Sequence, residues 1–150
     1  MLPKRGRATE ELALIKSVFV DSSAWIAFFS SRDQHHASAD RIFRKAIQTN
    51  RHLFTSNLVL AEIHRLLLFR AGSRAATAAL DRIEASPRIR IEFADSNHHQ
   101  SAKVWLSKLS SLAISYTDAV SFAMMESVNC AEVIGYDQHF SAAGFILMSS

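Results

Sequence analysis

Short apolar runs alternate along the chain with longer segments in which apolar residues recur every three or four positions. Ser17 to Val20 (SVFV) is short, β-branched and apolar on both faces, which is typical of a strand in a sheet covered on both sides. His36 to Thr49 instead spaces its apolar residues at i, i+3, i+4, i+7 and i+8, on one face of a helix. The pattern therefore predicts strands that are separated by helices.

Turn and cap residues place the other boundaries. The predicted strands run from Ser17 to Val20, His52 to Thr55, Ile89 to Phe93, Glu132 to Tyr136 and Phe145 to Met148. The predicted helices run from a cap at Asp21 or Ser22 to Phe29, from His36 to Thr49, from Leu58 to Ala71, from a cap at Ser73 to Ala85, from a cap at Asp95 to Leu109, and from Thr117 to Val128. Strands joined by helices of this length imply right-handed crossovers. We therefore expect an α/β fold with a mainly parallel sheet between layers of helices.

Length and composition fit one globular domain. The chain has 150 residues, 49% of them hydrophobic and 21% charged, and we expect residues 17–150 to form the domain after an N-terminal extension of residues 1–16. No apolar stretch reaches the roughly 18 residues of a membrane span. Glu10 and Glu11 interrupt the place where a signal peptide would be apolar, and Cys130 is the single cysteine, so we expect a cytoplasmic protein.

The net charge of +3 favours a polyanionic partner weakly. Arg65 and Arg70 fall in the predicted helix that also carries Glu62, and Arg65 is a candidate contact for phosphate groups. A solvated helix face would show the same pattern.

Four of the 14 acidic residues have neighbourhoods unlike those of a solvated face. Asp21 and Asp137 directly follow apolar strands, so both are predicted at the carboxyl edge of the parallel sheet, where sites form in such folds. Glu62 lies in LVLAEIHRLLLF, on an otherwise apolar helix face. Asp118 stands in the first turn of its helix, where the helix dipole favours a negative charge.

Converging carboxylates repel one another unless a cation lies between them. Oxygen ligands without a thiolate favour Mg²⁺ or Mn²⁺ over Zn²⁺. Such an ion can bind a phosphate oxygen, activate a water molecule and stabilise the leaving oxygen of a phosphodiester. The four acids therefore predict a metal-dependent hydrolase of phosphodiester bonds.

Four segments carry a family resemblance. VFVDSSAWIAFF, SNLVLAEIHRLL, SYTDAVSFAMM and VIGYDQHFSAAGF resemble, in order, the four acidic motifs of PIN-domain nucleases, and the likeness is greatest to VapC-type toxins of bacterial toxin–antitoxin pairs. The resemblance spans Ser17 to Met148 and implies a three-layer α/β/α sandwich.

The resemblance also implies a function. Asp21, Glu62, Asp118 and Asp137 would be the catalytic, metal-binding acids of an endoribonuclease, with Mg²⁺ or Mn²⁺ as cofactor and RNA as substrate. It further implies a homodimer and a cognate antitoxin protein that covers the acidic groove.

Two positions depart from the family pattern. Gly135 stands where the family usually has Ser or Thr two residues before the last acid, so we expect the hydroxyls of Ser22 and Thr117 to support the metal ligands instead. His139 stands where a further acid is common, and it would bind phosphate when protonated or simply cover the groove.

Three alternatives remain open at this level. A housekeeping RNA-processing nuclease would carry the same motifs, as would an interaction module without turnover. A phosphatase or phosphotransferase also uses an Asp after the first strand, but it commonly has a second Asp two positions later, where this chain has Ser23.

Overall fold

One parallel sheet organises the chain. The computed structural model describes residues 17–150, so the predicted N-terminal extension, residues 1–16, lies outside the described residues. The strands are β1 (Ser17–Val20), β2 (His52–Ser56), β3 (Ile89–Glu92), β4 (Glu132–Ile134) and β5 (Ile146–Leu147). They lie in the order β3-β2-β1-β4-β5, and each neighbouring pair is parallel. The predicted α/β class with a mainly parallel sheet is confirmed.

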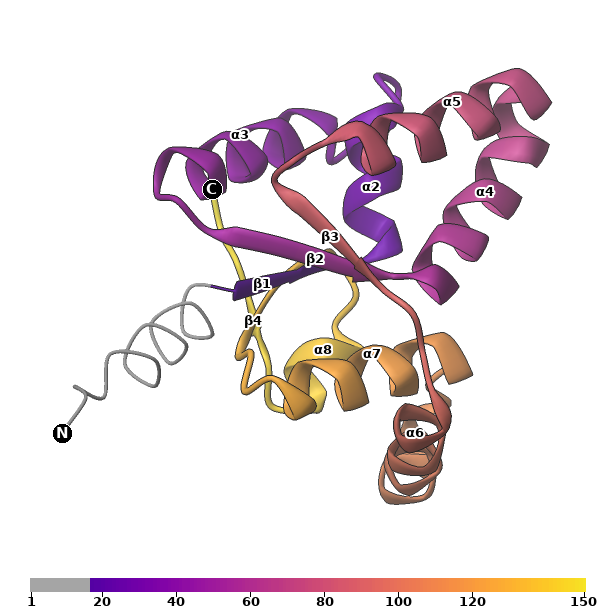
Figure 1. The fold of residues 1–150 in the computed structure, drawn as a ribbon, viewed down its shortest axis with the longest axis vertical. Helices are drawn as coiled ribbons and strands as arrows, with labels where there is room; N and C mark the ends of the chain where they lie inside the picture. Colours follow the sequence, from indigo (N-terminus) through magenta and orange to yellow (C-terminus); the bar gives the residue numbers. More distant parts are fainter. Residues whose placement is uncertain (1–16) are drawn as a thin grey trace, which may run out of the picture.

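Helices cover both faces of this sheet. The helices are α2 (Ser22–Phe29), α3 (His36–Gln48), α4 (Asn57–Ala71), α5 (Ser73–Ala85), α6 (Ser96–Lys108), α7 (Tyr116–Ser127) and α8 (His139–Ala142). Figure 1 shows α2 to α5 on one side of the strands and α6 to α8 on the other, which is the expected three-layer arrangement. Within the described part of the chain, no helix is long and apolar enough to cross a membrane.

Side-chain caps fix where helices begin, largely as the sequence predicts. Ser56 Oγ accepts a hydrogen bond from the backbone N–H of Val59, and Asp95 closes a capping box with His98. The predicted cap at Ser73 is wrong, because Gly72 occupies that position with a φ of 91° and Ser73 is the first helical residue. Glycine tolerates this left-handed backbone, so Gly72 serves both as the C-cap of α4 and as the N-cap of α5.

The segment after β4 differs most from the prediction. The strand ends at Ile134 rather than Tyr136, and the short helix α8 follows, which the sequence pattern did not predict. A second short element, the 3-10 helix Ser110–Leu112, lies in the predicted loop before α7. Helices of one turn are too short to show a periodicity, so pattern alone does not reveal them.

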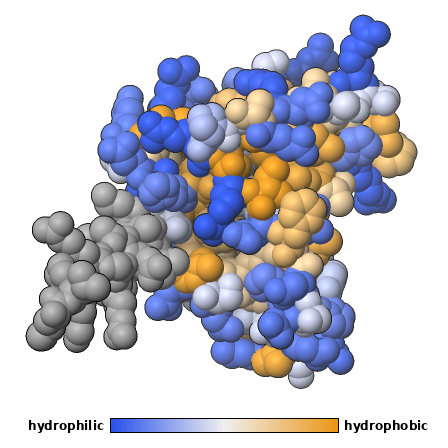
Figure 2. Space-filling view, viewed as in Figure 1, coloured by the Kyte–Doolittle hydropathy of each residue, from blue (hydrophilic) through white to orange (hydrophobic). Residues whose placement is uncertain are grey.

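Aromatic side chains fill the core between the sheet and α7. Phe122 of α7 is fully buried, and its ring centroid lies 5.4 Å from Trp105, 5.0 Å from Phe140 and 5.5 Å from Phe145. These contacts join α6, α7 and α8 to the last strand. Figure 2 shows polar residues over the outer helices, with apolar ones visible between the two helix layers.

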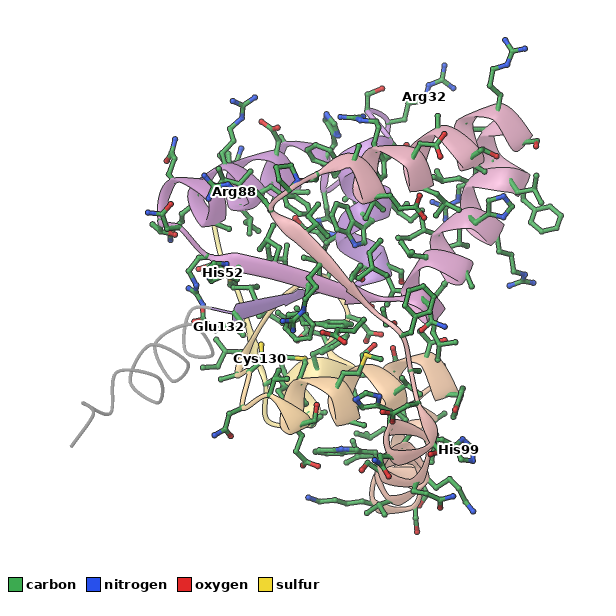
Figure 3. All side chains as sticks on the ribbon, viewed as in Figure 1. Arg32, His52, Arg88, His99, Cys130 and Glu132 are labelled. Carbon is green, nitrogen blue, oxygen red and sulfur yellow. The ribbon has the colours of Figure 1, made fainter. Side chains whose placement is uncertain are left out.

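The amino-terminal edge of the sheet carries a separate set of side chains. Arg51 and Glu132 form an ion pair of 2.7 Å there, and Figure 3 shows Glu132, His52 and Cys130 together on this side. Cys130 is 3% exposed, and burial raises the pKa of its thiol, as expected for a packing residue. The four acids predicted to form the site line a groove at the opposite, carboxyl edge of the sheet.

We predict that Phe122→Ala lowers the free energy of unfolding by about 3 to 5 kcal/mol, because it removes a ring that three other aromatic side chains contact. Urea denaturation followed by circular dichroism measures the change. Phe69→Ala is the matched control, since Phe69 is 79% exposed. Its effect should stay within about 0.5 kcal/mol. Equal effects of the two substitutions would contradict the core assignment.

Candidate functional site

The acidic groove lies where the direction of the strand order reverses. From β1 the chain proceeds outward to β2 and β3, whereas β4 and β5 lie on the other side of β1. Ligands of open parallel sheets bind beyond the carboxyl ends of the strands at such a point. A groove of about 270 Å³ opens there, and its lining includes all four predicted acids together with Asp33 and Arg70.

Asp21 is the most enclosed of the four acids. It is 4% exposed, follows β1 directly and caps α2, and its backbone N–H donates to Ile134 O at 3.0 Å. The pKa of its carboxyl group is raised to about 7, chiefly by burial and to a smaller extent by the negative charges of Asp118 and Glu62, while hydrogen bonds from the Ser23 side chain and the Ser22 backbone oppose the shift. The charged carboxylate is therefore costly in this position without a nearby cation.

Glu62 reaches the groove from α4. Its Oε1 accepts a hydrogen bond of 2.7 Å from Ser22 Oγ, across 40 positions of sequence. The hydroxyl of Ser22, which was predicted to support the metal ligands, thus donates to Glu62, while the backbone of Ser22 hydrogen-bonds to Asp21. This bond fixes the direction of a long, flexible side chain at the rim of the groove.

Asp118 and Asp137 approach each other from α7 and from the loop after β4. Asp118 is held by a capping box, in which its Oδ2 accepts from the backbone N–H of Ser115 and its own N–H donates to Ser115 Oγ. Asp137 Oδ1 accepts from the backbone N–H of His139 at 2.9 Å. His139 Nδ1 lies 3.3 Å from Asp118 Oδ2 and 3.4 Å from Asp137 Oδ1.

Two of the four predicted acids, Asp118 and Asp137, form a close group with His139 within the groove. The ligand atoms of Asp118, Asp137 and His139 all lie within 4.8 Å of one another, and no other such group occurs in residues 17–150. Asp21 and Glu62 line the same groove without joining that group. The residues fit a divalent cation, because they offer oxygen donors and one imidazole around a site that otherwise concentrates negative charge.

Ser23 is a residue of this site that sequence reasoning missed. Its Oγ donates to Asp21 Oδ2 at 2.8 Å and accepts from the backbone N–H of Tyr136 at 2.9 Å. Gly135 lies beside it, and a Cβ added there would be 3.1 Å from Asp21 Cβ and 3.3 Å from Ser23 Oγ. Ser23, in the first turn of α2, therefore places a hydroxyl beside Gly135.

Two further predicted residues lie outside these contacts. The hydrogen bonds that fix Asp118 come from Ser115, not from the hydroxyl of Thr117. Arg65 is exposed on α4 and does not line the groove, whereas Arg70 does. Neither observation assigns a role to these side chains.

Comparisons with known proteins agree with this geometry. The family model described as the PIN domain matches residues 18–146. The 23S rRNA-specific endonuclease VapC20 of Mycobacterium tuberculosis is 36% identical over 129 residues, which cover 86% of this chain and 95% of that protein. The crystal structure of VapC20, described as a sarcin-ricin loop cleaving toxin, matches with a TM-score of 0.80 at 34% identity and covers 89% of this chain and 99% of the other.

A more distant structure has the same fold. VapBC2 from Rickettsia felis, bound to a DNA fragment from its promoter, matches with a TM-score of 0.65 over 88% of this chain and 97% of the other. Its sequence identity is 15%, so this similarity concerns the fold alone.

Asp21 should make stability depend on pH in the absence of metal. Because its pKa is raised to about 7 in the folded protein, its stabilising contribution is complete below pH 4 and is lost as pH rises to about 7. The substitution Asp21→Asn replaces the carboxyl group with an amide that does not ionise, so it removes this loss of stability at high pH. Urea denaturation in EDTA should show the variant to be on the order of 2 to 4 kcal/mol more stable than wild type at pH 8, with a much smaller difference at pH 4.5.

Asp81→Asn, which changes an exposed acid on α5, is the control for that comparison. Its effect should not change with pH between these values. A difference between Asp21→Asn and wild type that is the same at both pH values would refute the raised pKa.

Ser23→Ala should destabilise the protein by about 1 to 3 kcal/mol, because it leaves Asp21 Oδ2 and the Tyr136 N–H without the hydroxyl partner they share. Thermal or urea denaturation at neutral pH measures this change. Ser111→Ala, at an exposed position, provides the comparison. If the two substitutions have the same effect, Ser23 does not hold the site together.

Proposed function

The chain belongs to the PIN domain family, and from this membership we propose that it is a divalent-metal-dependent endoribonuclease that hydrolyses RNA phosphodiester bonds. The single observation that supports this most is the convergence of Asp21, Glu62, Asp118 and Asp137 on one groove at the carboxyl edge of the sheet. We assign the catalytic domain to residues 17–150.

The residues of the groove have different roles in the proposed site. Asp118 and Asp137 present carboxylate oxygens close to each other, while Ser23 fixes the buried carboxylate of Asp21 and Ser22 directs Glu62 toward the groove. Mg²⁺ or Mn²⁺ bound there would supply charge stabilisation at the phosphate and activation of the attacking water. Arg70 lines the same groove, and its guanidinium would supply a positive charge for a substrate phosphate.

Ribosomal RNA is the first substrate to test. VapC20 carries the name of a 23S rRNA-specific endonuclease, and this chain shares 36% identity with it over nearly the whole of that protein. Specific recognition of RNA depends on loops and unstacked bases, which groove shape and nearby side chains select. We therefore extend the substrate class, RNA, to this chain and make the identity of the RNA an outcome of the test.

The proposed role is that of the toxin of a type II toxin–antitoxin module, acting in the cytoplasm as a homodimer and held inactive by a cognate antitoxin. The support is the similarity to VapC20, which is described as a toxin. A housekeeping RNA-processing role for the same nuclease is the second candidate. A phosphatase is disfavoured, since the position two residues after Asp21 holds Ser23, whose hydroxyl is already bonded to Asp21 and Tyr136.

Cleavage of purified 23S rRNA, with transfer RNA as the comparison, tests the activity in Mn²⁺, in Mg²⁺ and in excess EDTA. Wild type should cut RNA only with a divalent ion, and Asp21→Asn and Asp118→Asn should each lower the rate about a hundredfold or more, because each removes a negative charge that helps to hold the ion to which the reacting phosphate binds. Asp81→Asn, prepared identically, should retain the wild-type rate.

Three results would contradict the proposal. Cleavage that persists in EDTA would exclude the metal mechanism, and cleavage by Asp118→Asn at the wild-type rate would exclude the site. Absence of cleavage of either RNA by correctly folded protein would favour an interaction module that retains the acidic motifs.

A further inference from the structure

The side chain of His139 lies among the carboxylates instead of covering them. Its Nδ1 is 3.3 Å from Asp118 Oδ2 and 3.4 Å from Asp137 Oδ1, and the side chain is 34% exposed. Together with Asp118 and Asp137 it forms a group of three possible ligand atoms that lie within 4.8 Å of one another, and residues 17–150 contain no other such group. Sequence reasoning gave this histidine a role toward phosphate or as a cover of the groove, and this geometry suggests another.

The distances from His139 Nδ1 to the two carboxylates match those between neighbouring ligand positions around one ion. Ligands at adjacent corners of an octahedron around an ion with bonds of about 2.1 Å lie about 3 Å apart. Nδ1 meets this condition toward both carboxylates. A small shift of the side chains would let all three atoms contact a single cation.

The backbone holds the three groups in place before any cation binds. Ser115 and Asp118 form a capping box at the start of α7. His139 is the first residue of α8, and its backbone N–H donates to Asp137 Oδ1 at 2.9 Å, so the histidine and the carboxylate are oriented together. Preorganisation of this kind is what a tight metal site requires.

We propose that His139 is a direct ligand of the divalent ion through Nδ1, and that this ligand shifts the preference of the site from Mg²⁺ toward Mn²⁺. The proposal rests on the proposed function only in taking the groove to be a metal site. Carboxylates suit Mg²⁺ and Mn²⁺ alike, whereas an imidazole is a poor ligand for Mg²⁺ and a good one for transition metals. A neutral ring with its proton on Nε2 leaves the Nδ1 lone pair free to coordinate.

The competing arrangement is an imidazolium that only forms ion pairs with Asp118 and Asp137. In that case His139 would occupy the place of the cation and would have to leave when the cation binds. The two arrangements differ in whether a nitrogen atom is bonded to the bound ion, which can be measured without any substrate.

Electron spin echo envelope modulation of Mn²⁺ bound to the full-length protein detects such a nitrogen. We expect the wild-type spectrum to show ¹⁴N coupling of a directly coordinated imidazole, and His139→Ala and His139→Asp to lack it. His35→Gln is the matched control, because His35 also lines the groove but is not in the ligand group. It should keep the coupling.

Affinity measurements give the second readout. His139→Ala should weaken Mn²⁺ binding by about tenfold to a hundredfold and Mg²⁺ binding much less, so that the ratio of the two dissociation constants falls. His139→Asp should restore tight binding with a preference closer to that of an all-oxygen site. Isothermal titration calorimetry on RNA-free protein measures both ions.

Mn²⁺ bound to wild type without nitrogen coupling would overturn this proposal and leave the nuclease assignment intact. Coupling that persists in His139→Ala would overturn it as well, and wild-type protein that binds no Mn²⁺ would overturn both proposals. Protein that shows the coupling and the shifted preference but cleaves no RNA would support the metal ligand and contradict the nuclease.

Discussion

The buried carboxylate of Asp21, which directly follows β1 and caps α2, is the constraint that arranges the rest of the site. A charged group with 4% exposure has almost no access to water, so its charge must be balanced by protein groups or by a bound cation. The hydrogen bonds from Ser23 and Ser22 balance it only partly, because the pKa of Asp21 remains raised to about 7. The nearby charges of Asp118 and Glu62 increase the need for a cation.

This constraint explains the local architecture around the ends of β1 and β4. The backbone of Asp21 continues the pairing with β4, which places its side chain against Gly135, where a larger residue would crowd it. Ser23 uses the available space, and its hydroxyl bonds both to the acid and to the chain just after β4. The strand therefore ends early, and the chain turns into the loop that carries Asp137 and into α8, which carries His139.

This arrangement of side chains lies within a chain that belongs to the PIN domain family. The chain shares its fold and 36% sequence identity with VapC20, and its own four predicted acids line a groove at the carboxyl edge of the sheet. Ser23 places a hydroxyl beside Gly135, and His139 places an imidazole beside Asp118 and Asp137.

The sequence by itself determined the layout of elements and the choice of acids. Strands and helices of several turns follow from hydrophobic periodicity, a local property, and a carboxylate placed after an apolar strand is predicted at the sheet edge whatever the strand order. Glu62 was recognisable because its helix face is otherwise apolar.

Only the tertiary structure decided which side chains meet. The strand order β3-β2-β1-β4-β5, the bond between Ser22 and Glu62 across 40 positions, and the bond between Ser23 and the Tyr136 backbone across 113 positions leave no trace in a local pattern. The helix α8 is a single turn, so its placement of His139 beside Asp118 was also invisible. Hydrogen bonding and ligand geometry act through space, whereas periodicity reports only which face of an element is buried.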